Sequence, residues 1–292
     1  MIIVTGTKRS GTSMWMQILK AAGYAIVGEA FPRNWADTIR AGNRLGFYES
    51  PLRRGIYYAT NPDPHSGEYL CPLATQRVAV KVFVPGLLRT ELRFVHRVIA
   101  TIRPWQEYKH SVERLYRIEN QSRAALRSAR GLAPSEPREP CMRSPVLAWW
   151  NDNYGLLRDA ALRRYPLHLV SYARVLARPG ECVEAALAFL GAGDPARAIA
   201  QIHGELRTQY APASTEFPEE LDRDALTTCD ELYQRVHAGI RLDAAFFARL
   251  DRTHLRLLPR LRADHARVQA LRRTAAEWGR ALPPKAANQG PS

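Results

Sequence analysis

A glycine-bounded loop near the start of the sequence has the residue types and spacing of a phosphate-binding loop. It lies between a short apolar run and an amphipathic helix pattern, and it reads Gly6-Thr7-Lys8-Arg9-Ser10-Gly11-Thr12-Ser13. Two glycines allow the backbone to curl so that amide groups and a helix N-terminus converge on an anion. The spacing satisfies G-x-x-x-x-G-x-[ST], but Thr12 stands where nucleoside triphosphatases carry lysine. We therefore predict that residues 8–13 bind a phosphate group, with Lys8 and Arg9 as the cations.

Cations, rather than carboxylates, accompany two later apolar runs. Lys81 lies within residues 78–83, and Arg103 directly follows residues 98–102. A magnesium nucleotide needs a carboxylate at a strand end to hold the metal, so Mg-ATP fits poorly. A nucleotide with two separated phosphate groups fits better, because the loop can bind one group while Arg103 binds the other. Ser111, about two helical turns after Arg103, shares a face with the start of its helix and is a further candidate for the second phosphate.

Short apolar runs alternate with helical patterns along most of the chain. Strands are expected at residues 2–5, 24–27, 78–83, 98–102 and 167–172, and such short, wholly apolar runs are typical of parallel strands buried on both faces. Helices are expected at residues 13–22, from Pro104 and after Pro179. The second helix should bury one stripe, formed by Trp105, Tyr108, Val112 and Leu115. This alternation predicts an α/β fold, a three-layer sandwich with a mostly parallel sheet.

Composition and charge narrow the functional classes. The chain has 292 residues, of which 46% are hydrophobic, and a net charge of +14, so general disorder is excluded. Only five of the 42 basic residues are lysine, so coding bias accounts for much of the arginine and the net charge alone says little about partners. Apolar runs fall short of the ~18 to 20 residues of a membrane span, and no cleavable leader is recognisable, so we expect no membrane span and a cytoplasmic location. The four cysteines lie at least 41 residues apart, which predicts free thiols and no metal clip.

Two segments and the C-terminal part depart from the alternating pattern. Residues 59–75 and 120–145 are rich in Pro, Ser, Gly and Arg. We expect irregular segments there, which either form walls of an acceptor pocket or are surface loops without a role. From residue 219 onward only helical patterns remain. The domains are therefore expected to be an α/β domain at 1–212, a helical extension packed on it at 213–281, and a disordered tail at 282–292.

The two cationic elements resemble those of sulfotransferases that use 3′-phosphoadenosine 5′-phosphosulfate (PAPS). Residues 8–13 are similar to the K/R-S-G-T-T/S element of that family, and Arg103-Pro104 to Ser111 is similar to its R-x-P…S element for the 3′-phosphate. Further similarity, all within residues 1–210, covers Gly46-Phe47-Tyr48-Glu49, Val170-Ser171-Tyr172 and Phe189-Leu190-Gly191. The resemblance implies an α/β fold, PAPS as co-substrate and in-line transfer without a metal. The acceptor would be a hydroxyl or amine of a small molecule, carbohydrate, lipid or peptide, and neither its identity nor the oligomeric state follows from the sequence.

Three departures from the family pattern limit what the resemblance implies. Pro104 follows Arg103 directly, Ala173 replaces an acidic residue, and the R-K-G…G-D-W-K closing loop of the animal cytosolic enzymes is absent. The rest of the 3′-phosphate pocket is therefore unassigned, with Arg207 as one possible supplement.

The resemblance also implies catalytic cations. Arg9 matches the lysine of the family's loop and would meet the negative charge that grows on the leaving phosphate oxygen. Arginine keeps its charge permanently, so its role would be electrostatic rather than proton donation. Lys8 is an alternative for this role or a solvated neighbour. Lys81 matches the lysine of the K-T-H-L-P element, which contacts the sulfate, and a lysine in an apolar strand is too costly to be incidental.

The general base must come from outside that element, because Phe83 occupies the histidine position. Glu29 is the first candidate, since it follows the second strand about twenty residues after Arg9, similar to the catalytic glutamate of carbohydrate and glycolipid sulfotransferases. Glu49 is the second. Each has a structural alternative, Glu29 as a loop cap and Glu49 as the partner of a basic residue. Among the histidines, only His65 lies in an irregular segment of interest.

Two other functional classes remain open at this point. A kinase or nucleotide hydrolase with a degenerate phosphate loop would bind Mg-ATP. A polyanion-binding module would use the eleven arginines between Arg235 and Arg280, where there are only four acidic residues. Solvated faces of amphipathic helices explain those arginines more simply, and no nucleic-acid partner is expected.

Overall fold

The structure is a computed structural model that describes residues 1–31, 43, 45–63, 66–129, 143–204 and 221–280. Its strands are β1 Ile2–Gly6, β2 Ala25–Val27, β3 Val78–Lys81, β4 Arg97–Ile102 and β5 Leu167–Ser171. Its α-helices are α1 Thr12–Ala21, α2 Val84–Leu87, α3 Trp105–Ala129, α4 Pro145–Arg163, α5 Tyr172–Ala177, α6 Pro179–Leu190, α7 Pro195–Ile199, α8 Arg223–Ala238 and α9 Ala244–Arg280. Two short 3₁₀ helices are η2 Pro51–Arg54 and η3 Leu92–Phe94.

The five strands form one parallel sheet in the order β2-β3-β1-β4-β5. β1 lies at the centre, where Ile3 pairs in register with Val80 of β3 and with Val98 of β4. All four strand pairs are parallel, as the short apolar runs predict. β3 ends at Lys81 rather than at Phe83, so the lysine is the last residue of its strand.

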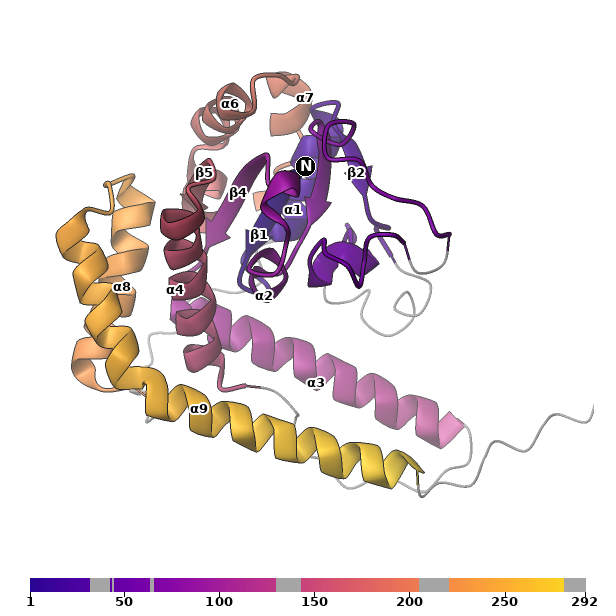
Figure 1. The fold of residues 1–292 in the computed structure, drawn as a ribbon, viewed down its shortest axis with the longest axis vertical. Coiled ribbons are helices and arrows are strands. Elements are labelled where there is room, and N and C mark those ends of the chain that lie inside the picture. The colour runs from indigo at the N-terminus through magenta and orange to yellow at the C-terminus, as the bar shows by residue number, and fades with distance from the viewer. Residues whose placement is uncertain (32–42, 44, 64–65, 130–142, 205–220, 281–292) are drawn as a thin grey trace, which may run out of the picture.

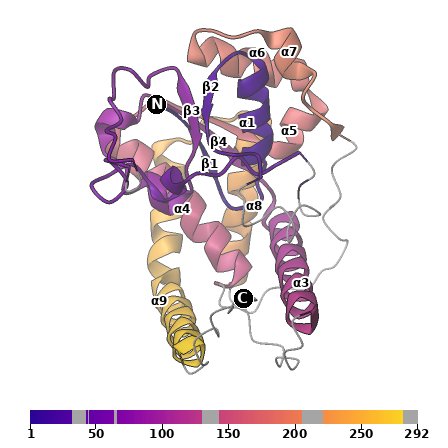
Figure 2. The ribbon, with the colours of Figure 1, turned by 90° about the vertical axis from the view of Figure 1, so that its right-hand side faces the viewer.

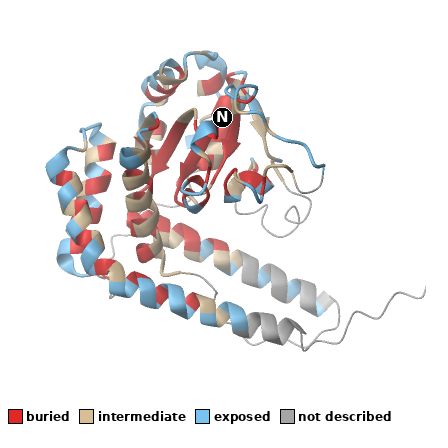
Figure 3. Ribbon diagram, in the orientation of Figure 1, coloured by how far each residue is buried: buried red, intermediate tan, exposed pale blue. Residues whose placement is uncertain are grey.

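Helices cover both faces of the sheet, which confirms the three-layer sandwich (Figures 1 and 2). Successive residues of a strand point to opposite faces. Ile2 and Val4 therefore pack in a cluster with α1 and α6, whereas Ile3 packs in a second cluster with α2 and α4. In Figure 3 the three central strands β1, β3 and β4 are almost wholly buried, whereas the edge strands β2 and β5 are partly accessible.

The C-terminal helices belong to the same core as the end of the sheet. One large apolar cluster joins Ile102 of β4 to side chains of α3, α4, α8 and α9, with Trp150 and Leu232 fully buried in it. The extension is thus packed on the α/β part, but the expected boundary at 212 and 213 lies outside the described residues. The expected tail, 282–292, lies outside them as well.

One expectation about the irregular segments is wrong. Residues 120–129 continue α3 as helix, because Ala, Arg, Leu and Gln in this stretch are good helix formers whatever its polarity. Residues 130–142 lie outside the described part of the chain. The described residues of the segment 59–75 contain neither helix nor strand, as expected. Among the helices that the structure describes, none combines the length and apolar character of a membrane span.

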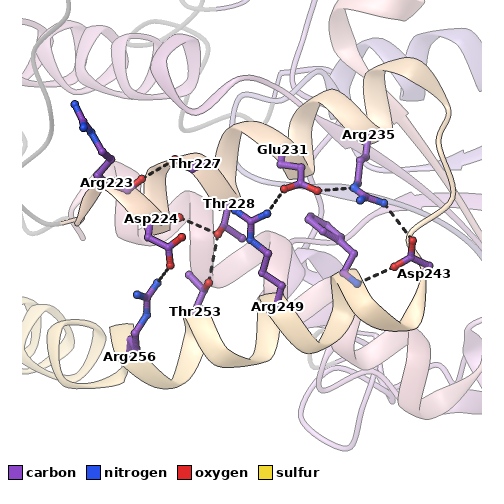
Figure 4. Close-up of polar contacts among 11 residues, drawn as sticks. Arg223, Asp224, Thr227, Thr228, Glu231, Arg235, Asp243, Arg249, Thr253 and Arg256 are labelled. Atoms are coloured by element: carbon purple, nitrogen blue, oxygen red, sulfur yellow. Dashed lines mark hydrogen bonds and ion pairs between the residues drawn. The ribbon is translucent and has the colours of Figure 1, made fainter.

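Ion pairs engage several of the C-terminal arginines within the helices themselves (Figure 4). Glu231 of α8 binds both Arg235 and Arg249, and Asp224 lies 2.5 Å from Arg256. Each exposed pair contributes at most about 1 kcal/mol. These pairs give acidic partners to three of the eleven arginines that suggested a polyanion-binding surface.

Candidate functional site

The glycine-bounded loop lies at the carboxyl end of β1, the central strand. β1 pairs with β3 on one side and with β4 on the other, so the strand order reverses beside it. Ligands of open parallel sheets bind at such a reversal. The N-cap of α1 is Gly11, which makes no side-chain capping bond, and the first turn carries no acidic residue. The backbone amides of that turn are therefore available to an anion.

The two glycines of the loop are required by close packing. A Cβ on Gly6 would lie 2.4 Å from the carbonyl oxygen of Thr101, and a Cβ on Gly11 would lie 2.6 Å from Cδ2 of Tyr172. Both glycines also have positive φ angles, 143° and 107°. Arg9 adopts the left-handed region as well, with φ 74°, which is costly for a residue with a side chain and often marks a functional loop.

Hydroxyl groups hold the loop in this shape. Ser10 Oγ donates to the carbonyl oxygen of Thr7 at 2.7 Å, and Thr101 Oγ1 donates to the carbonyl oxygen of Ser10 at 3.0 Å. Ser13 Oγ donates to the carbonyl oxygen of Phe47 at 3.2 Å. Two of the predicted ligand hydroxyls, those of Ser10 and Ser13, thus make protein contacts here.

Three predicted donor-binding residues come together beside the loop. Arg9 Nε donates to Ser111 Oγ at 3.2 Å, and an Nη of Arg103 donates to the carbonyl oxygen of Arg9 at 3.3 Å. Ser111 is fully buried. Burial and the nearby charge of Arg103 lower the pKa of Arg9 to about 10, which still leaves it a cation at neutral pH. Arg103, which precedes α3, and Ser111, within it, thus both lie next to the loop.

Arg103 has two neighbours that sequence reasoning missed. Its Nε donates to Glu107 Oε2 at 2.8 Å in a buried ion pair, and its guanidinium lies 4.7 Å from the centre of the Tyr172 ring. The i, i+4 spacing of Arg103 and Glu107 was a usable signal. The contact with Tyr172 joins residues far apart in sequence, so no local pattern could reveal it.

The face of α3 that holds Glu107 and Ser111 has one further cation, Arg114, which is exposed to solvent. Arg114 follows Ser111 by three residues and Glu107 by seven, so the three side chains lie along one stripe of the helix. Arg114 is exposed, and its positive charge contributes to the low pKa of Arg9. Lys8 Nζ lies 5.3 Å from the centre of the ring of Tyr116, which is two residues after Arg114 in α3.

Lys81 ends β3, which lies on the opposite side of β1 from β4 and Arg103. Its ammonium group is buried among oxygen acceptors. Its Nζ contacts the carbonyl oxygen of Phe47, Glu49 Oε1 at 3.2 Å and Ser13 Oγ at 3.4 Å. Burial lowers the pKa of Lys81 to about 8, because desolvation and the charge of Arg9 outweigh the attraction of Glu49. Lys81 is therefore poised to gain or lose its proton near neutral pH.

The two candidate bases differ in their surroundings. Glu29 and Glu49 pair through their backbones, with reciprocal N–H···O bonds of 3.2 Å. The side chain of Glu49 is buried beside Lys81, whereas Glu29 is exposed. Glu49 Oε2 is buried without a hydrogen-bond partner, although Arg53 Nε lies 3.6 Å away. The Glu49 carboxylate thus lies between two basic residues, Lys81 at Oε1 and Arg53 at Oε2, and its Oε2 accepts no hydrogen bond.

The remaining predictions concern residues elsewhere. His65 and Arg207 both lie outside the described residues. Among the residues that are described, no three His, Cys, Asp or Glu side chains cluster as metal ligands would.

Comparisons with known proteins identify no family for this chain. No protein-family model matches the chain, and no curated protein sequence matches it. A solved structure described as "Sulfotransferase Domain from the Curacin Biosynthetic Pathway" aligns with a TM-score of 0.38 and 12% identity, over 88% of this chain and 96% of that one. The functional assignment therefore depends on the geometry of the site.

Proposed function

We propose that this protein is a sulfotransferase that moves a sulfuryl group from PAPS to a hydroxyl or amine of an acceptor. The observation that carries the proposal is the arrangement of four cations, Lys8, Arg9, Lys81 and Arg103, around a phosphate loop. Buried carboxylates pair with two of them, Glu49 with Lys81 and Glu107 with Arg103. The described site is therefore cationic overall and suits a nucleotide with well-separated anionic groups.

The donor would bind across the loop and the start of α3. The amides of the loop and of the first turn of α1 would hold the 5′-phosphosulfate. Arg103, Ser111 and Arg114 lie along the α3 side and would hold the ribose 3′-phosphate. Arg114 would add a positive charge to this pocket, in place of those that the R-K-G…G-D-W-K closing loop supplies in the animal enzymes.

The reaction would transfer SO₃ in line. The bond between sulfur and the phosphate oxygen breaks while the acceptor oxygen bonds to sulfur, and Glu49 Oε2 takes the acceptor's proton. Arg9 meets the charge that grows on the leaving phosphate oxygen. Lys81 contacts the sulfuryl oxygens and, through its bond to Glu49 Oε1, orients the base. Glu29 is exposed, and its role would be structural, through its backbone bridge to Glu49.

Replacing Arg103 with alanine should test the donor assignment. We expect affinity for adenosine 3′,5′-bisphosphate to fall about tenfold or more, while affinity for adenosine 5′-monophosphate changes little, because only the bisphosphate carries the 3′ group. Isothermal titration calorimetry with both nucleotides measures the difference. Lys109→Ala, on another face of α3, is the matched control and should leave both affinities unchanged.

Equal losses for the two nucleotides would contradict the role of Arg103. Tight binding of Mg-ADP by the wild-type protein, with no preference for the bisphosphate, would favour a kinase or hydrolase instead.

The pH dependence of the reaction should report Lys81. Because its protonated form is the active one and burial lowers its pKa to about 8, kcat/KM should fall as the pH rises through about 8. An unperturbed lysine would retain its charge to about pH 10. Lys81→Arg should move this decline to higher pH, since arginine stays charged. A wild-type rate that is constant from pH 7 to pH 10 would remove Lys81 from the mechanism.

A further inference from the structure

Helix α8 is bonded to the turn that carries Arg103. Trp105, two residues further on, opens α3, and its indole Nε1 donates to Asp230 Oδ1 of α8 at 2.8 Å. The carbonyl oxygen of Arg103 accepts a second indole N–H, from Trp149 of α4, at 2.7 Å. Two tryptophans therefore hold the backbone at Arg103 and just after it, and one of them, Trp105, is bonded to α8.

The same helix is bonded to the turn that carries Tyr172. Ser171 is the N-cap of α5, and its buried hydroxyl accepts the backbone N–H of Arg174 at 3.1 Å. The other partner of this hydroxyl is Nδ1 of His237 in α8, at 2.8 Å. An Nη of Arg174 also donates to the carbonyl oxygen of His237 at 3.5 Å. The end of α8 thus fixes the residue that immediately precedes Tyr172.

Tyr172 and Arg103 form one wall of the candidate 3′-phosphate pocket. The Tyr172 ring lies under the guanidinium of Arg103, and it fills the space that a side chain on Gly11 would need. A shift of either turn by a fraction of an ångström would therefore change both the direction of the guanidinium and the shape of the phosphate loop.

α8 can act as a rigid spacer between the two turns. Asp230 and His237 are seven residues apart, which is two helical turns and about 10 Å along the axis, so both lie on the same side of the helix. Bonds to α9 hold α8 in place, among them the ion pair of Glu231 with Arg249 (Figure 4). The buried stripe of α8 packs in the cluster that includes Trp105.

We propose that α8 sets the spacing of Arg103 and Tyr172, and thereby gives the donor site its selectivity for a nucleoside bisphosphate, with Asp230 and His237 as positioning residues. This inference rests on the proposed function. It makes the C-terminal helices part of the nucleotide site although none of their described side chains is assigned to the ligand.

The experiment compares Asp230→Ala and His237→Phe with the wild-type chain by calorimetry. Each substitution removes one hydrogen bond to a turn, so binding of adenosine 3′,5′-bisphosphate should weaken about threefold to tenfold. Binding of adenosine 5′-monophosphate should change less than about twofold, because the loop amides remain. His237→Asn, which keeps a polar group near the position of Nδ1, should recover most of the lost selectivity.

Arg256→Ala is the matched control. It removes an ion pair with Asp224 at the opposite end of α8 and should leave both affinities unchanged. Asp230 is exposed, so Asp230→Ala should fold, which a thermal unfolding curve verifies.

Folded variants that keep the wild-type selectivity, or that lose affinity for both nucleotides equally, would overturn the proposed role of α8. They would leave the proposed function of the protein untouched. A wild-type chain that does not prefer the bisphosphate would instead overturn the proposed function, and this inference with it.

Discussion

Replacing Arg9 with alanine should lower kcat for sulfuryl transfer by about 10² to 10³, the cost of removing one preorganised group that stabilises transition-state charge. Arg9 is held in a left-handed backbone conformation, and its side chain is fixed by Ser111 at 3.2 Å. It therefore needs little reorganisation when charge develops on the leaving oxygen. Donor affinity should fall less than kcat, because the loop amides and Arg103 still hold the nucleotide.

The measurement is release of adenosine 3′,5′-bisphosphate from PAPS. Water serves as one acceptor, and a panel of phenols, alcohols and sugars supplies the others. Arg9→Lys keeps the positive charge and should retain more activity than Arg9→Ala. If Arg9→Ala lost only donor affinity, with kcat unchanged, Arg9 would be a binding residue and not a catalytic one.

Replacing Glu49 with glutamine should lower kcat by about 10² to 10⁴, the range for a well-placed general base. The buried Oε2, which accepts no hydrogen bond although Arg53 Nε lies 3.6 Å away, is the reason for choosing this carboxylate. The matched variant, Glu29→Gln, alters the exposed member of the same backbone bridge and should change kcat less than about threefold. The pair of variants decides directly between the two candidates.

Stability must be measured alongside, because Glu49→Gln leaves Lys81 buried without its carboxylate, and breaking a buried ion pair can cost about 3 to 5 kcal/mol. Glu49→Asp retains the charge, so it should preserve stability while moving the carboxylate away from the acceptor. A greater loss of kcat in Glu29→Gln than in Glu49→Gln would reverse the assignment.

Local patterns in the sequence predict the sheet and one half of the site. Strands buried on both faces carry short apolar runs, and each of the five expected runs is a strand in the structure. Arg103, just before α3, and Ser111, within it, both bond to Arg9 of the loop, as their positions at the start of this helix predict. Helix propensity was underestimated at residues 120–129, where polar composition obscured a regular helix.

The rest of the site depends on contacts between distant segments. The backbone carbonyl oxygen of Phe47 accepts a hydrogen bond from Lys81. Every residue type has such an acceptor, so the sequence could not indicate this contact. Tyr172 meets Gly11 only because β5 lies two strands away from β1 in the finished sheet. The choice between Glu29 and Glu49 likewise needed burial, which two equally placed glutamates in a sequence do not reveal.

The central position of β1 has a consequence for synthesis of the chain on the ribosome. β1 is made first, but its two neighbours, β3 and β4, end only at Lys81 and Ile102. At about 5 to 20 residues per second, roughly 5 to 20 seconds pass before the strand has both partners. During that interval the five-residue apolar strand lacks both of its partners, so the centre of the sheet cannot form until β4 has been made.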